Sequence, residues 1–251
     1  MEQPVYHRVL LKISGEALGR SQTVLEQGVE KEQSIGLDFA TIDKVCDAIC
    51  EAVRMGIQVG VVVGGGNFWR GAKNSGGSME RCRADHMGML ATAMNALAVS
   101  DVLEQKGIEV RVQTAIEMRG VAEPYVRAEA VRHLEQGRVV IFGCGTGNPY
   151  FSTDTAAALR AVEIQADALL LAKNIDGVYT ADPRRDSTAR RYDAVSYAEV
   201  LEKRLGVMDS AATCLAMENH MTIQVFALED PQNFIRVLNG EKIGTIVKED
   251  I

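Results

Sequence analysis

The chain has 251 residues, of which 47% are hydrophobic and 24% charged, as in an ordinary globular protein. Its net charge of −7 argues against a nucleic-acid partner, which would require a basic face. No apolar run approaches the roughly 20 residues of a membrane-spanning helix, and the N-terminus lacks the basic segment and apolar run of a signal peptide. We therefore expect no membrane association and a cytoplasmic location.

The five cysteines show no C-x-x-C spacing. Cys46 and Cys50 would share one face of a helix, but two thiols alone do not make a zinc site, and core thiols are the better interpretation. We expect reduced cysteines, as in cytoplasmic proteins, and no protein-held metal.

Strand and helix patterns alternate along the chain, with continuous apolar runs for buried strands and apolar residues at helical spacing for helices. Strands are expected at 9–13, 58–63, 108–112, 138–142, 168–172, 222–226 and 244–247. Helices are expected at 39–54, 85–103, 127–135, 154–165, 197–204, 210–218 and 231–238. Repeated β–α units of this kind predict an α/β fold, a three-layer α/β/α sandwich with a largely parallel central sheet. No linker divides residues 1–251, so we expect a single domain.

In such sheets, ligands bind beyond the carboxyl ends of the strands. The first predicted strand carries Lys12 and runs into Ser14 and Gly15. A lysine in so apolar a strand is unusual unless its ammonium group reaches a polar site at the strand end. The alternative is an edge strand on which the apolar stem is covered while the charge stays in solvent.

The second predicted strand ends in the sequence Gly-Gly-Gly-Asn at 64–67, and Arg70 follows shortly after. Glycines directly after a valine-rich strand indicate that the backbone lies against something, either a phosphate or another segment of the chain.

The stretch from Gly145 to Ala156 joins an apolar strand to a helix through glycines, a proline and small hydroxyl residues. Free N–H groups at such a helix start form an anion site. In a simpler interpretation Ser152, Thr153 or Asp154 merely caps the helix. The P-loop pattern is absent from the chain, and a dinucleotide fingerprint fails because Asn148 stands where its third glycine should be.

Lys173 and Asn174 end a further predicted strand, and the Asp-Gly and Asp-Pro pairs within 176–183 are typical of a tight turn or hairpin. Four strand ends thus converge on one rim with the cations Lys12 and Arg70. The carboxylates in adjoining segments are Asp85, Asp154, Asp182 and Asp209. This combination suits phosphoryl transfer, in which the protein positions groups and neutralises spreading charge.

Several blocks of the sequence together resemble bacterial uridylate kinases of the amino acid kinase family. They cover 10–18, 60–67, 85–92, 145–154 and 176–183, with Val-Met-Asp at 207–209 and Gly-Thr at 244–245. The blocks at 85–92 and 146–149 are specific to uridylate kinases within that family. The resemblance implies transfer of the γ-phosphoryl group of ATP, with Mg²⁺, to UMP, giving UDP and ADP for pyrimidine nucleotide biosynthesis.

The resemblance also implies roles for individual residues. Lys12 would stabilise the transferring phosphoryl group and Asp209 would orient that lysine, while Arg70 and Asp154 would serve the same centre. The implied ATP-binding residues are Lys12, Ile13, Ser14, Gly15, Gly66, Arg70, Lys173, Asn174, Tyr179 and Asp182, with the adenine contact near 173–174 fixed only to within one position. The implied UMP-binding residues are Gly65, Asp85, Thr146, Gly147, Asn148, Pro149, Tyr150, Phe151, Ser152 and Thr153, and Asp85 would accept the ribose hydroxyls.

Relatives of this kind are homohexamers inhibited by UTP, and GTP activates some of them. The predicted helix at 85–103 carries more apolar residues than one buried stripe requires, which predicts a subunit interface unless the helix is sandwiched within the monomer. A polar insert at 20–36 replaces the short link of relatives. In relatives this region contributes to activation by GTP, and whether GTP activates this protein is therefore left open. The arginines at 184–191 predict a solvated basic turn, with an interface or an effector site as the alternative.

Two other functional classes remain as alternatives. An ATP-binding storage or regulatory protein of this fold would be expected to lack Lys12 or the UMP block. A kinase for glutamate, aspartate or carbamate would lack the Thr-Gly-Asn-Pro block at 146–149. Both features are intact here.

Overall fold

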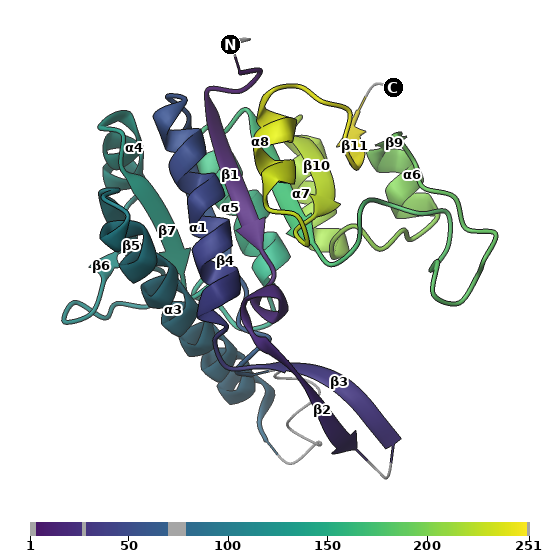
Figure 1. The fold of residues 1–251 in the computed structure, drawn as a ribbon, viewed down its shortest axis with the longest axis horizontal. Coiled ribbons are helices and arrows are strands. Elements are labelled where there is room, and N and C mark those ends of the chain that lie inside the picture. Colours follow the sequence, from purple (N-terminus) through teal and green to yellow (C-terminus); the bar gives the residue numbers. More distant parts are fainter. Residues whose placement is uncertain (1–3, 27–28, 70–78, 250–251) are drawn as a thin grey trace.

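The computed structural model describes residues 4–26, 29–69 and 79–249 (Figure 1). Its strands are β1 (Arg8–Ile13), β2 (Arg20–Glu26), β3 (Val29–Ile35), β4 (Gln58–Val63), β5 (Val110–Thr114), β6 (Glu123–Pro124), β7 (Val139–Gly143), β8 (Ala168–Lys173), β9 (Ala194–Ser196), β10 (Thr222–Ala227) and β11 (Thr245–Lys248). Its α-helices are α1 (Phe39–Arg54), α3 (Arg81–Gln105), α4 (Arg127–Glu135), α5 (Thr153–Glu163), α6 (Tyr197–Glu202), α7 (Ser210–Glu218) and α8 (Gln232–Leu238). A 3₁₀ helix spans Gly15–Leu18.

The central sheet has the strand order β6-β5-β7-β4-β1-β8-β10-β11-β9. Strands β10 and β11 pair antiparallel, and the other neighbours in this sheet pair parallel. Side chains alternate between the two faces, as the pleat of a strand requires. In β1, Val9 and Leu11 join the core under α1, α3 and α8, whereas Leu10 joins the core under α4, α5, α6 and α7. The predicted α/β fold with a largely parallel sheet is confirmed.

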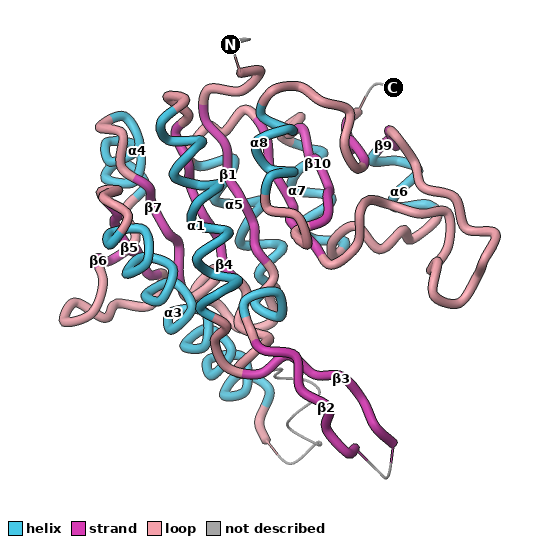
Figure 2. The backbone as a smooth tube through the Cα atoms, viewed as in Figure 1, coloured by secondary structure: helices cyan, strands magenta, loops and turns pink. Residues whose placement is uncertain are grey.

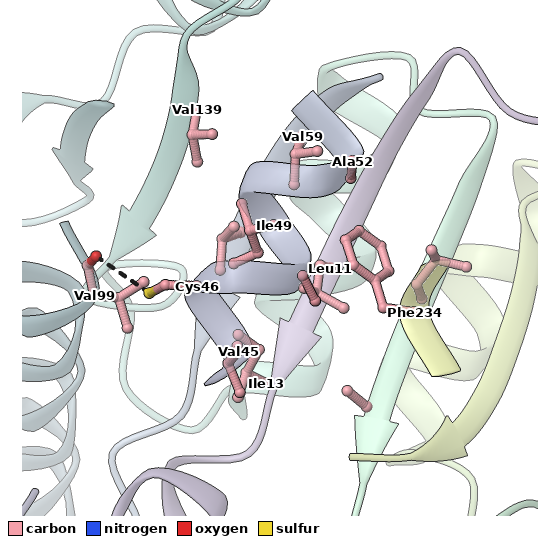
Figure 3. Packing of buried hydrophobic residues seen from close by; sticks show 14 of the residues in the cluster. Leu11, Ile13, Val45, Cys46, Ile49, Ala52, Val59, Val99, Val139 and Phe234 are labelled. Atoms are coloured by element: carbon pink, nitrogen blue, oxygen red, sulfur yellow. Dashed lines mark hydrogen bonds between the residues drawn. The ribbon is translucent and has the colours of Figure 1, made fainter. Parts of the chain in front are cut away.

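Helix α1 packs into the first of these two cores, and Figure 3 shows Cys46 directed toward the carbonyl of Val99 on α3. Asp38 begins the helix by accepting a hydrogen bond from the backbone N–H of Ala40. Burial raises the pKa of the Cys46 thiol to about 12, as expected for a core cysteine. Among the described residues, no group of three or more His, Cys, Asp and Glu side chains could hold a metal ion.

The predicted elements are present, with shifted ends. Helix α3 begins four residues earlier than expected, at Arg81, because Glu80 accepts hydrogen bonds from the backbone N–H groups of residues 82 and 83. Strands β6 and β9 and the 3₁₀ helix were not predicted. They are two to four residues long, which is too short for a periodic pattern. The two strands are defined by their pairing with β5 and β11.

The polar insert at 20–36 forms an antiparallel hairpin of β2 and β3, which projects from the body of the protein (Figures 1 and 2). Its base is fixed by two contacts. The Ser34 hydroxyl donates to the carbonyl of Glu16, and Gly36 exchanges hydrogen bonds with Asn67. We predicted only a polar insert here, because charged and polar residues occupy both faces and hide the alternation of a strand.

Strands β7, β4, β1 and β8 are consecutive neighbours and run parallel, so their carboxyl ends form one rim. The predicted convergence of four strand ends is therefore confirmed. Lys12 lies on a central strand, which excludes the alternative of a lysine on an edge strand. No helix within the described part of the chain is long and apolar enough to cross a membrane.

Candidate active site

An ion pair occupies the middle of the rim. The Lys12 ammonium group lies 2.7 Å from Oδ1 of Asp154, which belongs to the first turn of α5. The lysine is only 7% exposed, so its charge is directed into the site rather than into solvent. Burial alone would raise the pKa of Asp154, but the ammonium groups of Lys12 and Lys173 outweigh it and hold that pKa below its ordinary value. Asp154 is thus an ionised counter-charge.

A second lysine, Lys173 at the end of β8, faces the same centre. Its ammonium group donates to the carbonyl of Val207 and interacts electrostatically with Asp154 and Asp209. Burial lowers the pKa of Lys173, Asp154 opposes that shift, and the nearby charge of Lys12 adds to it. We expected Lys173 in the segment that holds adenine and ribose. The structure puts its charge beside Lys12.

Asp209 has different partners from those we expected. It is the N-cap of α7, where its carboxylate accepts from the backbone N–H of Ala212. The same carboxylate accepts the hydroxyl groups of Ser152 and Thr155 at the start of α5. The carboxylate in contact with Lys12 is Asp154, so Asp209 does not orient the lysine by direct contact. It ties the start of α7 to the start of α5.

The cap of α5 is Ser152, whose hydroxyl oxygen accepts from the backbone N–H groups of Asp154 and Thr155. Of the three candidates for this cap, Ser152 is therefore correct, and capping does not account for Asp154. A serine cap satisfies two N–H groups and leaves the aspartate in the first turn to face Lys12.

The glycines after β4 lie against other segments of the chain. A Cβ atom built on Gly15 would stand 2.5 Å from the carbonyl oxygen of Gly64, and one built on Gly65 would stand 2.9 Å from the carbonyl oxygen of Gly88 in α3. Side chains at Gly15 or Gly65 would therefore push these segments apart. Of the two explanations for the glycines, close approach of another chain segment applies at 64 and 65.

A cavity of about 270 Å³ opens on one side of the Lys12–Asp154 pair. The expected UMP-binding residues that line it are Gly65, Asp85, Thr146, Phe151, Ser152 and Thr153. Gly66, which we expected on the ATP side, lines this cavity as well. Trp69 also lines it, and its indole N–H donates to the carbonyl of Ala84. We did not predict Trp69, although the signal was visible, since it is the single tryptophan of the chain and lies three positions after Gly66.

Asp85 projects into this cavity from the second turn of α3, so it does not cap a helix. Its two oxygens lie 2.9 and 2.8 Å from Nε of Arg81. One of them also accepts the backbone N–H of Tyr150, a non-glycine residue with φ of +72°. Asp85 thereby holds the loop at 146–153 against α3.

Residues 147–150 of that loop do not line the cavity, but they determine the conformation of the loop. Gly147 lies with φ of +77° against Ala115, and Asn148 exchanges hydrogen bonds with Thr146. Pro149 and Tyr150 do not line the cavity. Their part in the site is thus to set the path of the backbone.

Two further clefts lie at and after the end of β8. The first, of about 390 Å³, is lined by the expected ATP-binding residues Lys12, Ser14, Lys173, Asn174 and Asp182, together with Glu16, Ile175 and Arg184. The second, of about 410 Å³, is lined by Tyr179 and Asp182 among other residues of the 175–183 segment, and by residues 203–206. The two clefts are neighbours, since Ile175 and Asp182 line both.

Two of the expected ATP-site residues that the structure describes, Ile13 and Gly15, do not line these clefts with a side chain. The Ile13 side chain is fully buried in the core under α1, so only its backbone is near the rim. Gly15 packs on Gly64 as described above. Arg70 lies outside the described residues. The predicted hairpin or turn at 176–183 is present as a bridge between Tyr179 and Arg191, and the Tyr179 hydroxyl donates to Asp176.

The site therefore has a cavity lined by Ser152 and Thr153, directly before Asp154, and clefts lined by Lys12, Lys173 and the segment at 175–183. This is the geometry of a two-substrate enzyme that transfers a charged group between neighbouring ligands. Residues 7–227 match the model of the amino acid kinase family, and the chain belongs to that family.

Solved structures carry the comparison further. The chain is similar to the UMP kinase from Bacillus anthracis, with 38% identity over 98% of this chain and 97% of that one and a TM-score of 0.90. It is also similar to the UMP kinase from Ureaplasma parvum, with 33% identity over 97% of this chain and 99% of that one and a TM-score of 0.87. The uridylate kinase from Archaeoglobus fulgidus is 28% identical over 98% of this chain and 100% of that one, with a TM-score of 0.72.

Proposed function

We propose that this protein is a UMP kinase, which transfers the γ-phosphoryl group of ATP to UMP and releases UDP and ADP. The observation that carries the proposal is the 38% identity to a UMP kinase across 98% of the chain, together with an intact lysine–aspartate centre close to two ligand spaces. The cavity beside Asp85 suits the monophosphate, and the cleft at 175–183 suits ATP.

The chemistry of this centre is electrostatic. Negative charge spreads over the phosphoryl oxygens during transfer, and fixed cations in a site of low dielectric stabilise it. Lys12 and Lys173 supply that charge from neighbouring strands, and Asp154 keeps the Lys12 ammonium group in place. Asp209 contributes by fixing the start of α5, which carries Asp154. We place Arg70 in the same role as Lys12.

Mg²⁺ is implied for ATP chemistry, and the residues fit a metal that arrives with the nucleotide. Mg²⁺ is usually held by one or two carboxylates together with substrate phosphates and water, and needs no cage of protein ligands. Asp154 and Asp209 are the carboxylates at this centre that would hold it. The ion would add positive charge on the phosphates. The protein's own contribution is to hold Lys12, Lys173 and the two nucleotides in line.

An acceptor panel tests the proposal. ADP release is measured with ATP, Mg²⁺ and either UMP, CMP, dUMP, glutamate, aspartate or carbamate, and each acceptor is repeated without ATP as a control. We expect UMP to give the highest kcat/KM. Turnover with an amino acid or carbamate in place of UMP would make the protein a different kinase. ATP binding without turnover of any acceptor would favour the storage or regulatory class.

Assembly and regulation are part of the proposal. The apolar stripe of α3, formed by Met87, Leu90, Met94 and Leu97, is 37–47% exposed in the single chain. This exposure argues against the alternative in which α3 is sandwiched within the monomer. Its spacing of three, four and three residues suits packing against the same helix of a second copy. We propose a homohexamer, with UTP as feedback inhibitor and GTP as a possible activator.

We also propose that residues 1–251 act as one amino acid kinase domain, whose N-terminal part mainly binds UMP and whose C-terminal part mainly binds ATP. The continuous sheet supports the single domain. The lining residues support the division, because the cavity beside Asp85 is built largely by segments around α3 and the cleft at 175–183 by segments after β8. A cytoplasmic location and a role in pyrimidine nucleotide supply accompany the proposal. The described cysteines are free thiols, which supports that location.

A further inference from the structure

Two asparagines form a buried pair behind the glycine loop. The amide nitrogen of Asn67 donates to the side-chain oxygen of Asn95 at 2.9 Å, and the amide nitrogen of Asn95 donates back at 2.7 Å. Asn95 lies on α3 and is fully buried, and Asn67 is 3% exposed. Asn95 also donates to the carbonyl oxygen of Gly64 at 2.6 Å. The orientation of the peptide after β4 is thus set by a side chain of α3.

The position of the Gly64 peptide affects the binding sites of both substrates. Its carbonyl lies against Gly15, and its next neighbour Gly65 lines the cavity beside Asp85. A shift of the Gly64 carbonyl therefore moves the acceptor side and the donor side relative to each other. The Gly64 N–H donates to the carbonyl of Ile13 at 2.9 Å, and the hydrogen bond from Asn95 restrains the carbonyl of Gly64.

One turn before Asn95, Thr92 holds the other loop of the cavity. Its hydroxyl donates to the carbonyl of Met89 at 2.7 Å and accepts the backbone N–H of Cys144 at 2.7 Å. Thr92 is 3% exposed and Cys144 is fully buried. Cys144 has φ of +63° and leads directly into Gly145, where the loop at 146–153 begins. The hydroxyl of Thr92 satisfies an N–H group that has no access to water.

We propose that Thr92 and Asn95 are positioning residues, which hold the two loops of the acceptor cavity on one rigid helix. Thr92, which itself lines the acceptor cavity, acts on acceptor binding through the Cys144 amide, and Asn95 acts on transfer through the Gly64 carbonyl. The proposal rests on the proposed function, with UMP as acceptor. It predicts different kinetic effects for two residues that lie three positions apart on the same helix.

The first test replaces Thr92. Thr92→Val keeps the shape and removes the hydroxyl, so the loop after Cys144 loses its anchor. We expect the KM for UMP to rise about 10-fold, equivalent to about 1.4 kcal/mol, while the KM for ATP changes by less than about twofold. Thr92→Ser retains the hydroxyl and should restore most of the UMP affinity. Ser100→Ala is the matched control, because it removes another buried hydroxyl from α3 about two turns away.

The second test replaces Asn95. Asn95→Leu keeps the number and branching of the side-chain heavy atoms and leaves the Gly64 carbonyl without its donor. We expect kcat to fall about 10-fold, while the Kd for UMP measured by calorimetry changes by less than about threefold, because alignment is lost and no contact to UMP is removed. Cooperative urea unfolding checks that each variant is folded. If Asn95→Leu does not fold, Asn95→Ser is measured in its place.

The outcomes are separable. An unchanged KM for UMP in Thr92→Val, or an equal rise in Ser100→Ala, overturns the role of Thr92. An unchanged kcat in the Asn95 variant overturns the role of Asn95. If the wild-type protein neither binds nor phosphorylates UMP, the proposed function itself fails, and that result is seen before any variant is compared.

Discussion

Substitutions in the Lys12–Asp154 pair are expected to affect the free energy of unfolding and the rate of turnover separately. Lys12→Met removes the ammonium group and retains a side chain of similar length that fills the same space. At 2.7 Å, and with an effective dielectric constant of about 20, the attraction in this pair is about 6 kcal/mol before desolvation. Desolvation of both ions offsets most of it, whereas removal of one partner leaves a buried carboxylate uncompensated.

The expected cost of Lys12→Met is about 3 kcal/mol in the free energy of unfolding, at the lower end for a broken buried pair because Lys173 still faces Asp154. Turnover should fall about 10²–10³-fold, since a cation aimed at the transferring group is lost. That is about 3–4 kcal/mol of barrier. In the double variant Lys12→Met with Asp154→Asn, stability should recover to within about 1 kcal/mol of the wild type, and turnover should stay low.

Urea unfolding provides the stabilities, steady-state assays of ADP release provide kcat, and calorimetry provides the Kd for UMP, which should be near the wild-type value in Lys12→Met. Near wild-type turnover in that variant would refute the assignment of Lys12 to the transfer step. A double variant less stable than either single variant would refute the reasoning about the uncompensated carboxylate.

Three further predictions follow from the same contacts. Asp85 should accept the ribose hydroxyls, so UMP should be preferred to dUMP about 10-fold in kcat/KM and Asp85→Asn should narrow that ratio; equal use of both by the wild type would contradict this. Leu90→Glu, in the apolar stripe of α3, should reduce the mass measured by ultracentrifugation below six copies of 27.3 kDa. Val126→Glu, at a similarly exposed residue outside that stripe, should leave the mass unchanged. An unchanged mass in Leu90→Glu would show that α3 is not part of the interface. The pKa of Asp154 is lowered in the folded state, so its ionisation contributes stability above the ordinary value of 3.8 that is lost as the pH falls through the folded pKa. Acid unfolding should therefore be steeper below about pH 4 in the wild type than in Asp154→Asn, and identical profiles would argue against the shift.

The sequence was sufficient to predict the fold because its signals are local and repeated. Each apolar run is long enough to specify a buried strand, and each helix carries its own periodicity. The same reasoning failed for β6, β9 and the hairpin at 20–36. A strand of two or three residues has no pattern to detect, and a hairpin with polar residues on both faces lacks the alternation that marks a half-buried strand.

The residues of the site could be predicted from the sequence, but the side chains that they contact could not. Lys12 was identified from the sequence because a lysine in a buried strand needs a polar destination. Its partner was not, because Asp154 and Asp209 both lie at the start of a predicted helix and both suit an N-cap. The difference arises from geometry: Ser152 takes the cap of α5 and leaves Asp154 to Lys12, whereas Asp209 caps α7.

The sequence by itself determined the order of strands and helices, the glycines at the strand ends and the cation inside an apolar strand, because burial and backbone freedom are properties of each residue in its own segment. Only the tertiary structure decided what those residues touch. Asn95 reaches Gly64 across 31 positions, and Lys12 reaches Asp154 across a much longer stretch of chain. Contacts of this kind depend on strand order and on the packing of α3 and α5 against the sheet, and no local pattern encodes either.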